Sequence, residues 1–243
     1  MGQPELLSQD FLLHEDSHDD EKLEKKQRLL RNEFQTDGMW GIPLIRRQAI
    51  DLDQIEPWCY VKAKKDDKEY RHKTIHFFTY DWLYETVYTK PDVALEKLAQ
   101  YHALLTPDFS CYFDMPLALQ LHSTFKNRWC GAYWQSQGLN VIPAVGWGEA
   151  ASFAFCFDRV EPGSVVAIST YCREEYKREF MLGYDRMLEV INPSAIICYG
   201  DLFAEMRGNV NAFSPFNHKE LIAKLGMEEY TRRYLEGSLY PSN

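Results

Sequence analysis

Short apolar runs alternate with longer segments of mixed polarity along most of the chain. The run Thr74–Thr79 is apolar without strict alternation, as in a strand that is covered on both faces. The apolar runs predict strands at Trp58–Ala63, Thr74–Thr79, His102–Leu105, Asn140–Val145, Ser164–Ser169, Ala195–Tyr199 and Val210–Phe213. The longer segments predict helices at Pro91–Tyr101, Pro116–Gln137, Glu149–Phe155, Arg173–Ile191, His218–Leu225 and Glu228–Glu236, and a helical turn at Asp201–Met206.

This alternation predicts an α/β fold, because strands and helices that alternate with short connections form parallel sheets joined by right-handed crossovers. We expect a mainly parallel sheet built from repeated strand-helix units. Two arrangements suit such units: an open doubly wound sheet, and an irregular, incomplete (β/α) barrel. A regular barrel is disfavoured because it needs eight strands.

The chain has 243 residues, which suits one well-buried core. We predict a flexible acidic tail over residues 1–20 and a single α/β domain over residues 21–243. Residues 21–35 have helical composition, and Leu23, Leu30 and Phe34 share one face of that helix. The helix is expected to pack on the body of the domain or on a partner.

The net charge of −9 argues against long-range attraction of DNA or RNA. The basic run Lys62–Lys73 is interrupted by three acidic residues, which is typical of a solvated loop. The six cysteines are widely spread and form no CxxC pair, so we expect free buried thiols in a reducing compartment. No spacing typical of zinc or iron–sulfur ligands occurs, and the sequence identifies no metal or cofactor. The polar N-terminus and the lack of an apolar run of roughly 18 residues predict a cytoplasmic protein.

Ligands of parallel α/β folds bind at the carboxyl ends of the strands, which directs attention to the loops there. Five such loops carry polar or aromatic side chains and should meet at one edge of the sheet. Three of their residues are candidate catalytic groups: Asp108, Asp114 and Ser169. Four are candidate ligand-binding groups: Ser110, Trp147, Thr170 and Tyr199.

Each candidate also has a structural interpretation. Asp108 and Asp114 suit acid–base chemistry or a magnesium site, but each also suits the capping of a turn or helix. Ser169 and Thr170 follow a strand and suit anion binding or helix capping. Trp147 lies between two glycines and suits either stacking on a flat ligand or burial under a helix.

Two more candidate ligand-binding residues, Arg128 and Gln135, lie on the long helix predicted at Pro116–Gln137. They are seven residues apart and therefore share a face of that helix. Polar residues that point from a helix toward the core indicate a hydrogen-bonded network, whose role is either structural or ligand-binding.

Several of these strings occur together in one known family. The strings LTPDFSCYFDMP, NRWCGAYWQSQGLNVIPAVGWG, SVVAISTYC and IICYGD, preceded by RNEFQTDGMWGIPLIRR, resemble a bacterial and phage-borne family of unknown function, DUF4417. The resemblance extends from about Asn32 through Phe213. It implies a cytosolic protein of phages or other mobile elements, and it carries over no catalytic residues.

Three functions are compatible with these observations. The first is binding or hydrolysis of a small ligand, such as a nucleotide, sugar or phosphoester, at the carboxyl edge of the strands. The alternative is a non-enzymatic factor through which a mobile element binds a host or replication protein. Single-stranded nucleic-acid binding through stacked aromatic residues ranks lowest because of the net charge.

Overall fold

The structure is a computed structural model that describes residues 17–171, 175–213, 222–223 and 225–235. The chain divides into two compact units, Met1–Gln35 and Thr36–Asn243. In the first unit, helix α1 spans Ser17–Leu30, so it begins and ends earlier than the sequence predicts. Most of the predicted tail lies outside the described residues, and the domain boundaries stay a prediction.

The described residues of the second unit form seven strands, and every pairing between these strands is parallel. The first sheet is formed by β1 (Pro57–Cys59), β2 (Thr74–His76), β3 (Ala103–Leu105) and β4 (Val141–Ile142), in that order. The second is formed by β5 (Val165–Ser169), β6 (Ala195–Tyr199) and β7 (Val210–Ala212). A parallel bridge between Ala144 and Ala167 connects β4 to β5.

The strand order therefore follows the chain without a reversal, whereas a doubly wound sheet reverses its order at a switch point. Sequential order is the order of a (β/α) barrel. Within the described residues, however, β1 and β7 do not pair with each other. The α/β fold and the parallel sheet predicted from the sequence are confirmed.

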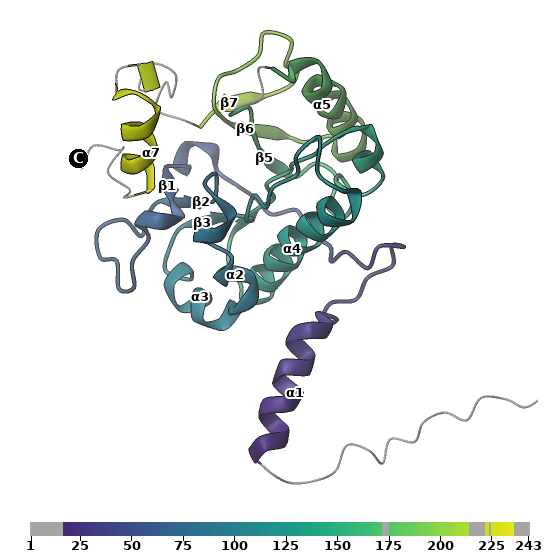
Figure 1. Cartoon of the computed structure of the whole chain (residues 1–243), viewed down its shortest axis with the longest axis vertical. Helices are drawn as coiled ribbons and strands as arrows, with labels where there is room; N and C mark the ends of the chain where they lie inside the picture. The colour runs from purple at the N-terminus through teal and green to yellow at the C-terminus, as the bar shows by residue number, and fades with distance from the viewer. Residues whose placement is uncertain (1–16, 172–174, 214–221, 224, 236–243) are drawn as a thin grey trace, which may run out of the picture. The chain divides into compact units, whose positions relative to one another are not determined.

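The helices of the second unit lie around the outside of the strands (Figure 1). The helices whose bounds lie within the described residues are α2 (Thr86–Thr89), α3 (Pro91–Leu98), α4 (Leu117–Ser136), α5 (Lys177–Ile191) and α7 (Met227–Leu235). Short 3₁₀ helices occur at Leu52–Gln54, Tyr60–Lys62, Asp81–Leu83 and Ala150–Ala154. Pro91 begins α3, where its missing N–H costs no hydrogen bond.

Several local predictions differ from the structure, and the strands predicted at Thr74–Thr79 and Asn140–Val145 are shorter, at Thr74–His76 and Val141–Ile142. The strand predicted at Trp58–Ala63 ends at Cys59, because the chain turns into a 3₁₀ helix at Tyr60. The segment Glu149–Phe155 contains a 3₁₀ helix and not an α-helix. Asp201–Met206 contains a single turn and no helix. The helix predicted at His218–Leu225 falls mainly on residues outside the described chain.

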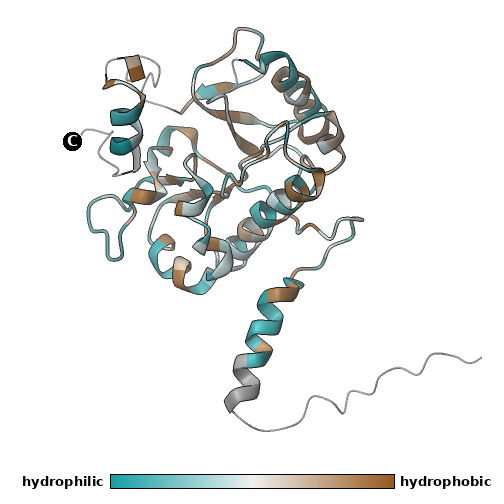
Figure 2. Cartoon of the chain, in the orientation of Figure 1, coloured by the Kyte–Doolittle hydropathy of each residue, from teal (hydrophilic) through white to brown (hydrophobic). Residues whose placement is uncertain are grey.

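The two faces of the sheet have separate cores. Side chains of one face form a cluster with α5, in which Val166, Ile168 and Ile196 pack against Phe180 and Tyr184. On the opposite face, side chains of β3, β4, β5 and β6 form a second cluster, together with residues that follow β2 and β7. Figure 2 shows hydrophobic residues along these central strands.

The second cluster shows that the sheet is curved. Phe78, which follows β2, stacks on Tyr199 of β6 at a centroid distance of 4.8 Å. His76 of β2 lies 5.2 Å from the Tyr199 ring and 5.7 Å from the Phe213 ring. Strands far apart in the sheet order therefore meet across one concave face, as in an incomplete barrel.

Buried thiols make the stability of this core depend on pH. Burial raises the pKa of Cys59 and of Cys198 from the usual 9.0 to about 11, and raises that of Cys156 as well. A thiol whose pKa is higher in the folded state stabilises the fold fully below pH 9, and this contribution disappears as pH rises toward 11. We expect each of Cys59 and Cys198 to account for about 1 kcal/mol of lost stability at pH 10.

Urea denaturation at pH 8, 9 and 10 measures this loss. The variant Cys198→Ala should show a smaller decrease over the same interval, because one of the titrating thiols is gone. Equal pH dependence in both proteins would contradict the assignment to Cys198.

Candidate functional site

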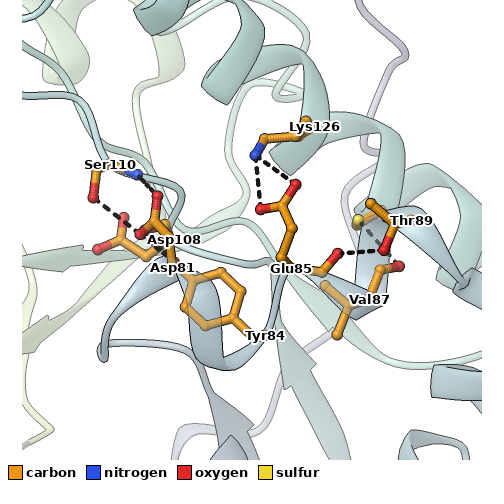
Figure 3. Close-up of polar contacts among 9 residues, drawn as sticks. Asp81, Tyr84, Glu85, Val87, Thr89, Asp108, Ser110 and Lys126 are labelled. Carbon is orange, nitrogen blue, oxygen red and sulfur yellow. Dashed lines mark hydrogen bonds and ion pairs between the residues drawn. The ribbon is translucent and has the colours of Figure 1, made fainter.

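The loops that follow β2 and β3 are joined by the carboxylate of Asp81 (Figure 3). Its oxygens accept hydrogen bonds from the Ser110 backbone N–H at 3.0 Å and from the Ser110 hydroxyl at 2.9 Å. The buried Tyr84 hydroxyl lies 3.0 Å from Asp81 Oδ1 and 2.7 Å from the Asp108 carbonyl oxygen. Burial, and then the charges of Asp81 and Asp108, raise the pKa of Tyr84, so its hydroxyl stays a donor. This junction fixes the loop that carries Asp108.

The side chain of Asp108 faces the carboxyl end of β4. A Cβ atom placed on Gly146 would lie 3.4 Å from Asp108 Oδ1. The two residues line a small pocket between the loop after β3, the loop after β4 and helix α4. Its lining residues are Asp108, Phe109, Cys111, Ser123, Thr124, Asn127, Arg128 and Gly146. The structure thus brings two predicted site residues, Asp108 and Arg128, to the same pocket.

Arg128 is almost fully buried, with 1% of its surface exposed. Its guanidinium donates to the backbone carbonyls of Asp158 at 3.2 Å, Ala144 at 3.2 Å and Cys156 at 2.7 Å. Burial lowers the pKa of Arg128 to about 10, which still leaves the side chain charged at neutral pH. Among the described residues, no carboxylate lies within ion-pair distance of this guanidinium. A buried positive charge therefore lines the pocket.

Asn127 connects this charge to the strands. Its side-chain oxygen accepts from the Thr106 hydroxyl at 3.0 Å and from Arg128. Its side-chain nitrogen donates to the carbonyls of Pro107 at 2.8 Å and Ala144 at 3.0 Å. The amide therefore holds α4 against the ends of β3 and β4. This is the hydrogen-bonded network that the polar residues of the long helix predict.

Lys126, the neighbouring cation, is engaged elsewhere (Figure 3). It forms an ion pair with Glu85 at 3.0 Å, and its ammonium lies 3.8 Å from the centre of the Phe109 ring. Glu85 thus neutralises the charge of Lys126, and neither residue lines the pocket.

The remaining loop candidates occupy other positions. Asp114 is exposed in a turn, and α4 begins after Pro116 without a side-chain cap, so Asp114 does not cap that helix. The Ser169 hydroxyl accepts from the Tyr171 backbone N–H at 3.2 Å. The Thr170 hydroxyl is buried and donates to the Asp201 carbonyl at 2.8 Å, which joins the loops after β5 and β6.

Three further candidates lie in the interior or hold other segments. Trp147 has 2% of its surface exposed, and its indole N–H donates to the Phe180 carbonyl at 3.2 Å. Tyr199 is buried in the concave core described above. The Gln135 amide donates to the Arg46 carbonyl at 2.7 Å and accepts from the Arg46 N–H at 2.9 Å. Of the two interpretations of Trp147, burial under a helix is the one that the structure shows.

Asp81 and Gly146 are site residues that the sequence analysis did not select, whereas Asn127 is one of the polar residues of the long helix for which a hydrogen-bonded network is predicted. Asp81 follows a strand in the same way as Asp108 and lies in a sixth loop at the same edge, after β2. Gly146 contributes by lacking a side chain, and only the packing of the two loops reveals that role.

The described residues contain no group of three or more His, Cys, Asp or Glu side chains that is arranged to hold a metal ion. In the same part of the chain, no helix is long and apolar enough to cross a bilayer.

The family model of a domain of unknown function, DUF4417, matches residues 34–217. The chain belongs to the DUF4417 family. The pocket residues of this DUF4417 protein all lie inside the match. The family expected from its sequence strings is therefore confirmed.

Two phage proteins are similar to this DUF4417 chain. The Gene 1 protein of Mycobacterium phage L5 is 35% identical over 176 residues, which are 71% of this chain and 76% of that protein. The Gene 1 protein of Mycobacterium phage D29 is 36% identical over 166 residues, which are 63% of this chain and 62% of that protein. No solved structure matches the chain. The relatives associate the protein with phages.

Proposed function

We propose that this DUF4417 protein binds a small ligand, such as a nucleotide, sugar or phosphoester, at the carboxyl ends of β3 and β4. One observation carries the proposal: Asp108 and the buried Arg128, from different elements, line one pocket at that edge. Ligands of parallel α/β folds bind at this edge, and convergent polar groups in a pocket are typical of such sites.

The pocket offers both kinds of hydrogen-bonding group. Arg128 supplies a buried cation, which is well suited to a phosphate or hydroxyl oxygen. Asp108 supplies an acceptor on the other side, and Ser123 contributes a hydroxyl. The pocket has room for about one water-sized group, so a single oxygen of the ligand would enter between them and the rest would lie outside. If the ligand is cleaved, Asp108 is the group positioned to exchange a proton with it.

The cellular setting is part of the proposal. Cys59, Cys156 and Cys198 are free and buried, which suits a reducing cytosol. Together with the phage relatives, this supports a protein that acts in the cytoplasm of a host cell during infection or from an integrated element.

A thermal-shift screen of the full chain against nucleotides, sugars, phosphoesters and inorganic phosphate tests the proposal. A ligand at a hundred times its Kd adds about 2.7 kcal/mol of stability. For a chain of this size, that corresponds to a rise in Tm of roughly 5–10 °C.

The Gly146→Ala variant identifies where the ligand binds. The added methyl group enters the pocket at an ordinary contact distance from Asp108, so the variant should fold and lose the ligand-induced shift. Asp108→Ala should also lose it, with a change in stability of about 1 kcal/mol or less. The control is Asp114→Ala, which removes an exposed carboxylate outside the pocket and should respond like the parent protein. A shift that persists in Gly146→Ala, or a blank screen, would refute the proposal.

A further inference from the structure

An exposed aromatic surface lies beside the pocket, on the loops that follow β2, β3 and β5. It consists of the exposed Tyr80, Trp82, Tyr112 and Tyr176 together with the partly buried Phe113, and we call it the aromatic band. The exposed fractions are 67% for Trp82, 55% for Tyr112, 48% for Tyr176 and 37% for Tyr80. Such exposure is costly in water, and a contiguous apolar surface of this kind marks an interaction site.

Ring contacts and hydrogen bonds connect the band from one end to the other. Tyr80 and Trp82 are stacked, with centroids 4.3 Å apart and rings inclined by 12°. Asp81 lies between them in sequence and binds Ser110, whose hydroxyl lies 3.1 Å from the Tyr112 hydroxyl. Phe113 follows Tyr112, and its ring centroid is 5.2 Å from that of Tyr176. The loops of three strands are therefore linked, by polar contacts between the first pair of loops and by a ring contact between the second.

The location of the exposed rings is not random. In the described part of the chain, every aromatic side chain in the exposed class lies in these same loops: Tyr80, Trp82, Tyr112, Tyr171 and Tyr176. Tyrosine and tryptophan are the residues that most often contribute binding energy at protein interfaces.

The charges near the band indicate what kind of partner it accepts. Asp114, Glu149 and Asp201 are exposed in loops at this edge and form no ion pair within the described residues. Lys177, a cation next to Tyr176, is paired with Glu205 at 2.7 Å. Carboxylates repel the phosphates of nucleic acids, and they attract cations. Aromatic faces also attract the cations of lysine and, more often, arginine.

We propose that the aromatic band is a docking surface for a protein segment rich in arginine. Its guanidinium groups would lie over the rings of Trp82 and Tyr112, and its charge would be matched by the surrounding carboxylates. This interaction goes beyond the small-ligand site and does not depend on it.

Fluorescence anisotropy with a labelled Arg-Gly repeat peptide tests the proposal on the full chain. Saturable binding is expected, which Trp82→Ala and Tyr112→Ala each weaken about two- to fivefold, the range of an exposed cation–π contact. Neither substitution changes the net charge, so the loss cannot come from weaker long-range attraction. The matched control is Val93→Ala, an exposed apolar residue on α3, which should bind like the parent protein.

Other outcomes overturn the proposal. Equal peptide affinity in Trp82→Ala, Val93→Ala and the parent protein would mean attraction by net charge alone. If the peptide does not bind, an arginine-rich segment is not the partner. If an oligonucleotide or oligosaccharide binds in its place and the binding depends on Trp82, the band accepts that class of partner instead. Peptide binding should be unchanged in Gly146→Ala, which shows that the band is separate from the pocket. Each of the two proposals can therefore fail without the other.

Discussion

Replacing Arg128 with alanine should lower the free energy of unfolding by about 3–5 kcal/mol, the range for breaking a buried charged network. The backbone carbonyls of Asp158 and Cys156 would lose the Arg128 donor, and the Ala144 carbonyl would keep only the Asn127 amide. The Asn127 side-chain oxygen would lose one of its two donors. Each buried acceptor that is left without a partner costs free energy, and the missing side chain leaves a cavity.

Chemical denaturation measures the change, and the expected decrease in Tm is roughly 6–20 °C for a chain of this size. The matched control is Arg186→Ala, which removes an exposed arginine paired with Glu189 at 2.8 Å. Exposed ion pairs contribute about 0–1 kcal/mol, so this variant should stay close to the parent protein. If both arginine variants lost equally little stability, the carbonyl cage around Arg128 would not be a structural element of the fold.

Replacing Trp147 with alanine should cost about 3–5 kcal/mol, as for other buried tryptophans. The ring packs between Phe157 and Phe180, at centroid distances of 5.6 and 4.8 Å. It also closes over Gly183 of α5, where an added Cβ would lie 2.1 Å from the indole nitrogen. The ring thus joins the end of β4 to α5.

The contact with Gly183 provides an internal test. Gly183→Ala alone should destabilise the protein by about 1–3 kcal/mol, because the rigid indole cannot move aside easily. In a Trp147→Ala background the same substitution should cost much less, since the clash is gone. Trp82→Ala is the control, because it removes a mostly exposed tryptophan and should cost about 0.5 kcal/mol or less. Strictly additive effects of Trp147→Ala and Gly183→Ala would contradict the packing described.

Local patterns predicted the elements well where the pattern is strong. Strand β6 has the bounds that the apolar run Ala195–Tyr199 predicts. The run Trp58–Ala63 was predicted too long, because residues that suit a strand also suit the 3₁₀ turn that buries Tyr60. At Asp201–Met206 helical composition was overridden, because Asp201 follows Gly200, which has a φ of 109°. The close approach of Gly200 to Thr170 fixes that conformation.

The candidate site was predicted in part. The rule that ligands bind at the carboxyl ends of strands selected Asp108, and the facing residues of the long helix selected Arg128. The rule does not distinguish Asp108, which faces a pocket, from Asp114, which lies exposed in the same loop. Asp81 follows β2 as Asp108 follows β3, so the same rule applies to it, whereas Gly146 acts by lacking a side chain and no local pattern marks it.

The sequence by itself determined the alternation of strands and helices, the parallel sheet and the family, because these depend on periodicity and on strings within short segments. Only the tertiary structure decided the order and curvature of the strands and the role of each strand-end residue. The side chains of Trp147 and Trp82 both follow strands, yet one is buried under α5 and the other is exposed. The difference arises because Gly183 leaves room for one indole, while the loop after β2 leaves the other uncovered. Contacts between segments distant in sequence set burial, and burial sets which polar and aromatic groups are available to a ligand.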